Sequence, residues 1–163
     1  MEEIRDTLLT RHGLQPDQLV VTLSPCPCAL SDRTALGTVL TNVLENAVKY
    51  SRQEDGSVPP IEIDVVPTER WIKIAITDQG IGIDRKFQKR VFRRFFRVPT
   101  EEVQRRHGSG LGLFVVSEIC RSLKARIAIQ SPESGRGTTV NIHVPTGPLR
   151  ASETTTESRT EPA

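Results

Sequence analysis

The sequence predicts an α+β two-layer sandwich, in which about three helices cover one face of a mixed, mainly antiparallel sheet. Helical and strand patterns are interleaved along the chain, which favours a layer of helices on a layer of strands. Two central strand patterns are separated by only four residues, a hairpin length, whereas a doubly wound parallel sheet would need a crossover helix there. The length of 163 residues, with 36% hydrophobic and 26% charged positions, suits one domain with one core.

The first half of the chain is expected to contain two helices and a strand. Residues 4–14 place apolar side chains at helical spacing, and residues 19–23 form an apolar strand pattern. A longer helix is predicted from Ser31 or Asp32, either of which can cap it, to about Tyr50. The core face of this helix comprises Leu36, Val39, Leu40, Val43, Leu44 and Ala47.

The second half is expected to supply the rest of the sheet and another helix. Residues 61–66 and 71–77 alternate apolar and polar side chains and form the hairpin pair. Residues 126–130 and 138–144 are predicted as two further strands, and an apolar helix is predicted over about residues 110–123.

Positive charge is concentrated in one segment. Residues 84–107 contain nine Lys or Arg and three Asp or Glu, so they carry +6 in a chain whose net charge is +2. This segment is therefore suited to a negatively charged partner. The chain has one Trp, one Tyr and no recognisable base-reading module. A phosphorylated small molecule or an acidic protein is favoured over nucleic acid for that reason.

The helix that ends near Tyr50 has a polar face opposite its core face. At about 100° per residue, a single arc of about 100° contains Asn42, Glu45, Asn46 and Lys49. Amide and carboxylate oxygens are ligands that Mg²⁺ accepts, and a lysine one turn further on can meet a phosphate. A solvated helix face is the alternative interpretation.

Asp78 continues the inward-facing series of the strand at residues 71–77, so a carboxylate is expected at the buried end of that strand, beside Gly80 and Gly82. A buried acid needs a hydrogen-bond donor, which an adenine amino group would supply. Glycines would let a flat ring approach the backbone. An ordinary turn is the alternative.

The stretch Gly108-Ser109-Gly110-Leu111-Gly112 opens the second apolar helix, where free backbone amides form a site for anions such as phosphates. It matches neither a Walker A loop nor a dinucleotide-binding fingerprint. Thr138 begins the last strand after Gly137. Its hydroxyl is placed to reach the same base, or it serves only strand propensity.

Taken in this order, the motifs resemble those of the catalytic ATP-binding domain of bacterial sensor histidine kinases. The wider superfamily, GHKL, also includes gyrase-type topoisomerases and heat-shock chaperones. The resemblance covers roughly residues 19–145. Five stretches carry it: residues 42–50 match the N box, 78–82 the first glycine box, 91–97 the F box, 108–112 the second glycine box and 137–138 the terminal threonine motif.

The resemblance implies the Bergerat ATP-binding fold of that superfamily, with ATP and Mg²⁺ as ligands. Asn46, with Asn42 nearby, would hold the metal, Lys49 would meet a phosphate, and Asp78 would meet the adenine amino group. Arg97 would contact the γ-phosphate from a mobile lid between the glycine boxes. The remaining implied ATP contacts are Tyr50, Gly80, Gly82, Gly108, Ser109, Gly110, Leu111, Gly112 and Thr138.

One position favours a histidine kinase among the members of the superfamily. ATP-hydrolysing and serine-kinase relatives have a glutamate base where this chain has Asn42, and an amide cannot accept a proton near neutral pH. A neutral imidazole needs no such base, and Glu45 on the same face is a candidate to assist. The predicted catalytic residues are thus Asn42, Glu45 and Arg97. A regulatory ATP-binding module without transfer and an anti-sigma-type serine kinase stay open as alternatives.

The phosphorylated histidine is expected on a partner domain, because His12, His107 and His143 do not stand in an acceptor motif. The predicted partner is a helical hairpin for dimerisation and phosphotransfer, in a longer parent chain or in another chain. A response regulator is an indirect partner.

The resemblance divides the chain into three parts. Residues 1–18 are predicted as a helix and a connection to the missing hairpin, and residues 19–145 as the catalytic domain. Residues 146–163, rich in Ser, Thr, Glu and Pro, are predicted as a disordered tail. No apolar run approaches the roughly 18 residues of a bilayer span, and the chain begins with acidic residues, so a cytoplasmic protein without membrane contact is predicted.

Overall fold

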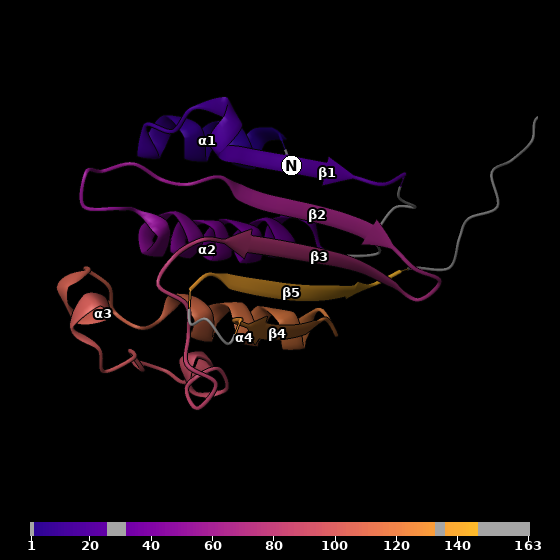
Figure 1. Cartoon of the computed structure of the whole chain (residues 1–163). Helices are drawn as coiled ribbons and strands as arrows, with labels where there is room; N and C mark the ends of the chain where they lie inside the picture. The colour runs from indigo at the N-terminus through magenta and orange to yellow at the C-terminus, as the bar shows by residue number, and fades with distance from the viewer. Residues whose placement is uncertain (1, 26–31, 133–135, 147–163) are drawn as a thin grey trace, which may run out of the picture.

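The computed structural model describes residues 2–25, 32–132 and 136–146, which form a layer of helices on a layer of strands (Figure 1). The sheet has five strands in the order β1-β2-β3-β5-β4. β1 runs parallel to β2, and the other neighbouring pairs are antiparallel. The strands are β1 (Leu19–Leu23), β2 (Ile61–Pro67), β3 (Trp71–Asp78), β4 (Arg126–Gln130) and β5 (Thr138–Pro145). The predicted mixed, mainly antiparallel sheet is confirmed.

Three helices cover one face of the sheet: α1 (Glu2–His12), α2 (Arg33–Ser51) and α4 (Gly112–Ser122). A 3-10 turn, Pro16–Gln18, joins α1 to β1. The short helix α3 (Glu101–Arg105) and another 3-10 turn belong to residues 83–107, which we call the lid segment. The lid segment extends past the end of the sheet, at the lower left of Figure 1.

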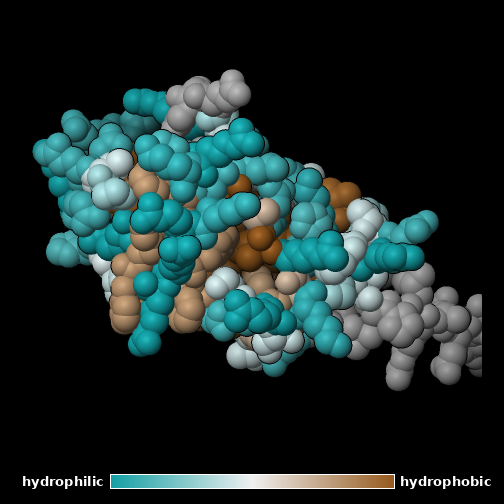
Figure 2. All heavy atoms as spheres, turned by 90° about the horizontal axis from the view of Figure 1, so that it is seen from below, coloured by the Kyte–Doolittle hydropathy of each residue, from teal (hydrophilic) through white to brown (hydrophobic). Residues whose placement is uncertain are grey.

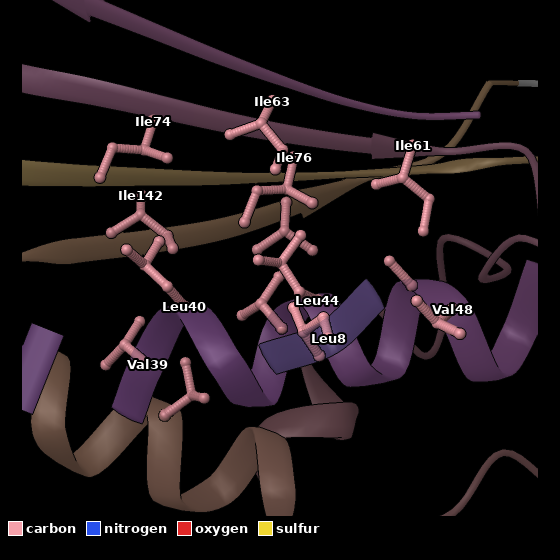
Figure 3. Close-up of a cluster of buried hydrophobic side chains, with 14 of the residues drawn as sticks. Leu8, Val39, Leu40, Leu44, Val48, Ile61, Ile63, Ile74, Ile76 and Ile142 are labelled. Carbon is pink, nitrogen blue, oxygen red and sulfur yellow. The ribbon is translucent and has the colours of Figure 1, made fainter. Parts of the chain in front are cut away.

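The core lies between α2 and the sheet (Figure 3). Aliphatic side chains of the two layers face one another there: Val39, Leu40, Leu44 and Val48 on α2, and Ile61, Ile63, Ile74, Ile76 and Ile142 on the strands. Leu8 of α1 is fully buried in the same cluster. Burial of each such side chain is worth about 1.5–3 kcal/mol. This packing holds α2 in a fixed rotation and thereby points its polar face away from the core.

The helix ends follow local chemistry. Asp32 caps α2, because its carboxylate accepts hydrogen bonds from the amides of Thr34 and Ala35 at 2.8 and 3.0 Å. α1 spans Glu2–His12 rather than the predicted residues 4–14, and Gly13 follows it with φ +63°, the left-handed conformation that ends many helices. α4 begins at Gly112, two residues later than predicted, because Gly110 has φ +72° and cannot be helical.

Two sequence predictions concern residues that lie partly or wholly outside the ranges that the structure describes. Ser31, the alternative cap, and residues 147–163 of the predicted disordered tail lie outside the described residues. Thr146 is described, and its amide donates to the carbonyl of Arg70. Among the described helices, none combines the length and the apolar character that crossing a bilayer requires.

Candidate functional site

A cavity of about 360 Å³ lies where the polar face of α2, the paired ends of β3 and β5, and the lid segment meet. Thirteen of the fifteen predicted site residues line it: Asn42, Glu45, Asn46, Lys49, Tyr50, Asp78, Gly82, Arg97, Gly108, Ser109, Gly110, Gly112 and Thr138. Gly80 and Leu111 do not. The size is within the range of ligand pockets. The structure therefore brings together motifs that are about 100 residues apart in sequence.

Apolar side chains outside the set of predicted site residues form much of the wall. They are Val43, Ala47, Ile81, Ile83, Val91, Phe96, Val98, Val103, Leu113, Ile129 and Val140. Figure 2 views the molecule from below, toward α4 and β4, and shows hydrophobic atoms visible between hydrophilic side chains. An apolar wall with a few polar groups suits a flat, partly hydrophobic ligand.

Asp78 is the buried acid of the cavity. It ends β3 on the same face as Ile72, Ile74 and Ile76, pairs with Thr138 of β5, and is 7% exposed. One carboxylate oxygen accepts a hydrogen bond from the amide of Gly80 at 2.8 Å. Burial raises the pKa of Asp78 above its usual value, while hydrogen bonds from the Gly80 and Thr138 amides act in the opposite direction. The carboxylate is thus a fixed acceptor at the cavity wall.

Gly80 contributes through close packing. A Cβ at this position would lie 2.5 Å from the carbonyl oxygen of Tyr50, a distance that side chains do not tolerate. The neighbouring Ile81 amide donates to that same oxygen at 3.3 Å, and the Gly137 amide donates to the Gly80 carbonyl at 2.8 Å. The first glycine box is thereby fastened to the end of α2 and to the start of β5.

Asn42 and Asn46 lie side by side against the start of α4. The Asn42 side-chain amide nitrogen donates to the carbonyl of Thr38 at 2.9 Å, which assigns its oxygen to the opposite side. A Cβ at Gly112 would lie 3.4 Å from that Asn42 oxygen and 3.7 Å from the Asn46 amide nitrogen. The two carboxamides therefore occupy the junction between α2 and the second glycine box.

Glu45 lines the cavity but has a partner that the sequence did not predict. Its carboxylate forms an ion pair with Arg11 of α1. The Glu45 side chain is 36% exposed and that of Arg11 is 56% exposed. The Glu45 carboxylate, a candidate to assist catalysis, therefore pairs with a residue of α1, outside the predicted catalytic domain.

Lys49 reaches from α2 to the second glycine box. Its ammonium nitrogen lies 4.8 Å from the centre of the Tyr50 ring, and a Cβ at Gly108 would lie 2.5 Å from it. The lysine and the tyrosine thus lie together at one end of the cavity. Glycine at position 108 leaves room for the Lys49 ammonium in this position.

The second glycine box presents an open helix N-terminus. Within the described residues, no side chain caps α4 at Leu111. Gly110 has φ +72°, and a Cβ there would lie 2.8 Å from the backbone of both Phe95 and Phe96. The chain can pass the F box at this point only because residue 110 is glycine. Unpaired amides at the start of a helix favour anions such as phosphates.

Arg97 lines the cavity, but its hydrogen bonds run within the lid segment. The guanidinium donates to the carbonyls of Val103 and Arg106, and its buried Nε has no partner among the described residues. Contact with a γ-phosphate would compete with these bonds. Arg106 was not predicted as a site residue, and nothing in the sequence separates it from its basic neighbour Arg105.

The comparisons with known proteins agree with this geometry. A family described as histidine kinase-, DNA gyrase B- and HSP90-like ATPase matches residues 31–148. The histidine protein kinase SaeS of Staphylococcus aureus (strain USA300) is 40% identical over 112 residues, which cover 68% of this chain and 31% of that protein. The chain therefore spans about a third of the length of that relative.

Solved structures show the same fold. The mycobacterial sensor histidine kinase MprB is 27% identical with a TM-score of 0.68, and the match covers 91% of this chain and 96% of that one. ShkA, solved at full length in complex with AMPPNP, has a TM-score of 0.72 at 20% identity, over 91% of this chain and 30% of that one. On the strength of the family match, the protein belongs to the histidine kinase-, DNA gyrase B- and HSP90-like ATPases, a family of ATP-binding domains.

Proposed function

We propose that this chain binds Mg²⁺-ATP and transfers the γ-phosphoryl group to a histidine on a separate dimerisation and phosphoacceptor hairpin. One observation carries the proposal: a single cavity joins a buried carboxylate, two side-chain amides and an open helix N-terminus. These groups suit a base, a metal and phosphates respectively. The histidine kinases among the matched proteins support the choice of acceptor.

Asp78 would recognise adenine. Its carboxylate accepts hydrogen bonds, so it favours the exocyclic amino group of adenine over the carbonyl that guanine presents at the corresponding position. A buried acceptor facing a second acceptor would be left unpaired, which is costly. Tyr50 would lie beside the base, with Thr138 next to Asp78 on the neighbouring strand.

The amides of α2 fit a magnesium ion. Mg²⁺ prefers oxygen ligands and commonly shares them with the phosphates of its nucleotide. Because the Asn42 amide nitrogen is bonded to Thr38, its oxygen is the group left to face α4, and Asn46 lies one turn further on. Asn46 and Asn42 would hold the ion, which neutralises phosphate charge when bound.

The chain's own cations and amides would hold the phosphates. Lys49 lies against Gly108, and the first amides of α4 are open beside it. These groups would place the γ-phosphoryl group at the mouth of the cavity and hold it for in-line attack. A contact from Arg97 to that group stays a prediction, since its donors are engaged within the lid segment.

The transfer itself requires a histidine from elsewhere. The chain has three histidines, and none lines the cavity. An acceptor imidazole nitrogen would attack phosphorus, a nitrogen–phosphorus bond would form, the bond to the β-phosphate oxygen would break, and ADP would leave. Glu45, which lines the cavity, would accept the imidazole proton, and the phosphoryl group would then pass to a response regulator.

Two measurements test the proposal. Titration with a fluorescent ATP analogue, with and without Mg²⁺, should show metal-dependent binding that Asn46→Ala weakens. The control Gln53→Ala, at an exposed carboxamide that does not line the cavity, should leave binding unchanged. Incubation with γ-labelled ATP should label a cognate hairpin, not this chain, and the label should be acid-labile. Binding without labelling of any hairpin favours a regulatory module, whereas acid-stable label favours a serine kinase.

A further inference from the structure

Arg106 connects the lid segment to the last turn of α2. Its guanidinium donates through Nη1 to the carbonyl of Lys49 and through Nη2 to the carbonyl of Arg52, the latter at 2.9 Å. The same guanidinium lies 5.9 Å from the centre of the Tyr50 ring. The side chain is partly buried by these contacts. Lys49 and Tyr50, which it touches, line the cavity, whereas Arg106 does not.

The bond to the Lys49 carbonyl contributes to the capping of α2. The last four carbonyls of a helix have no partner within it, and α2 ends at Ser51. The Val48 carbonyl accepts from the Arg52 amide at 3.1 Å, and the Tyr50 carbonyl accepts from the Ile81 amide. The Lys49 carbonyl accepts from Arg106. A cation at this end also interacts favourably with the helix dipole.

Both the backbone and the side chain of Arg106 form hydrogen bonds with residues that have further partners. Its carbonyl accepts a hydrogen bond from Arg97 within the lid segment. Arg52, whose carbonyl it binds, donates in turn to the carbonyls of His12 and Gly56. A displacement of the lid segment at residue 106 would therefore uncap α2 beside Lys49 and Tyr50.

We propose that Arg106 is a positioning residue that ties the conformation of the lid segment to the placement of Lys49 and Tyr50. This inference rests on the proposed nucleotide site, in which both residues contact the ligand. By linkage, a ligand that needs them in place binds more tightly when Arg106 holds them. The guanidinium is suited to this because its planar fork serves two carbonyls at once, whereas a lysine ammonium cannot reproduce that geometry.

Tyr50 offers a direct readout, because it is the only tyrosine of the chain. Protein labelled with 3-fluorotyrosine gives one ¹⁹F resonance, which reports on Tyr50 without any nucleotide. Arg106→Ala and Arg106→Lys should shift or broaden this resonance. Arg105→Ala is the matched control, because Arg105 is exposed and pairs with Glu101 instead. Its resonance should match that of the parent protein.

The second readout is affinity for a fluorescent ADP, which needs no γ-phosphate. Arg106→Ala should weaken binding about tenfold, within the usual range of coupling between sites. Arg106→Lys should fall between Arg106→Ala and the parent, and Arg105→Ala should stay within about twofold of the parent. Full affinity in Arg106→Lys would overturn the proposal in favour of simple charge attraction.

An unchanged ¹⁹F resonance in Arg106→Ala would also overturn the proposal. Arg106→Lys keeps the charge and is the variant to use if Arg106→Ala does not fold. Absence of nucleotide binding by the parent protein would refute the proposed function instead, and the ¹⁹F comparison would still decide the role of Arg106.

Discussion

The body of the domain and the lid segment are held together by different interactions. Between α2 and the sheet, aliphatic side chains such as Leu44 and Ile142 are fully buried. In the lid segment, arginines lie over aromatic rings, and Arg90 is 4.7 Å from the centre of Phe96 and 5.5 Å from that of Phe87. Side-chain donors such as Arg97 bond to backbone carbonyls there. We therefore expect the body to set global stability and the lid segment, apart from buried residues such as Val91, to rearrange at lower cost.

Phe95 illustrates how the lid segment differs from the body. It lies in the lid segment, is 60% exposed, and has φ +60°, a conformation that is unfavourable for a bulky side chain. Its backbone is in contact with the position where Gly110 lacks a side chain. Strained residues persist where the surrounding structure holds them, and they concentrate at functional sites. We therefore expect the cavity to lie between a rigid wall, formed by the body, and a weakly held wall, formed by the lid segment.

The largest expected effect is on the body. Leu44→Ala should lower the free energy of unfolding by about 2–5 kcal/mol, because it removes a fully buried side chain and leaves a cavity. Leu23→Ala makes the same chemical change at a side chain that is 60% exposed, and it should cost about 0.5 kcal/mol or less. Urea denaturation followed by circular dichroism measures both. Similar losses in the two variants would show that the core is not where the structure places it.

The next effect falls on the rigid wall of the cavity. Asp78→Asn should weaken ATP binding by roughly 10- to 100-fold and reduce the preference for ATP over GTP, because the carboxylate acceptor is lost. Asp84→Asn, at an exposed carboxylate of the lid segment, is the control and should bind like the parent. Competition titrations with both nucleotides measure the effect. An Asp78→Asn protein with unchanged selectivity would remove Asp78 from the proposed base site.

Asp78 also predicts a dependence of stability on pH. Burial raises its pKa in the folded protein, so the folded state binds a proton more readily than the unfolded chain. The stabilising contribution of the protonated form is complete below the unfolded value of 3.8 and is lost as pH rises through the folded pKa. Asp78→Asn should remove this loss, so its stability relative to the parent should increase with pH across that window. Parallel stability curves over pH 3–7 would contradict it.

Sequence patterns predicted the parts of the site that depend on local periodicity. The polar arc of α2, the inward position of Asp78 and the glycine-rich start of α4 follow from helix and strand geometry, and the structure brings them to one cavity. The hydrogen-bond partners of Arg97, Arg106 and Glu45 could not be predicted in this way. Long side chains reach partners from several directions, and tertiary packing decides which one they meet.

A fourth prediction concerns the weakly held wall. Arg97→Ala should reduce ADP affinity and phosphoryl transfer in parallel, each about tenfold, because it releases the carbonyls of Val103 and Arg106 from a charge-assisted donor. Arg94→Ala, which removes a guanidinium lying over the exposed Phe95 ring, is the control. Global stability should change little in both. A fall in transfer with ADP affinity intact would instead give Arg97 its predicted contact with the γ-phosphate.

The smallest expected effect concerns the ion pair between Arg11 of α1 and Glu45 at the cavity. A double-mutant cycle of Arg11→Ala and Glu45→Ala should give a coupling free energy of about 0.2–1 kcal/mol in thermal or urea unfolding, because both side chains are partly exposed and solvent screens their attraction. Salt should reduce that coupling further.

The effect of this ion pair on phosphoryl transfer should exceed its effect on stability. If Glu45 assists transfer, Arg11→Ala should slow phosphorylation of the hairpin while leaving ADP affinity unchanged, since Arg11 orients the carboxylate and does not line the cavity. Arg5→Ala provides a control on the same helix, because Arg5 bonds to the carbonyl of Pro16 and not to α2. Equal transfer rates in the Arg11→Ala and Arg5→Ala proteins would show that the ion pair is a surface contact without a part in the reaction.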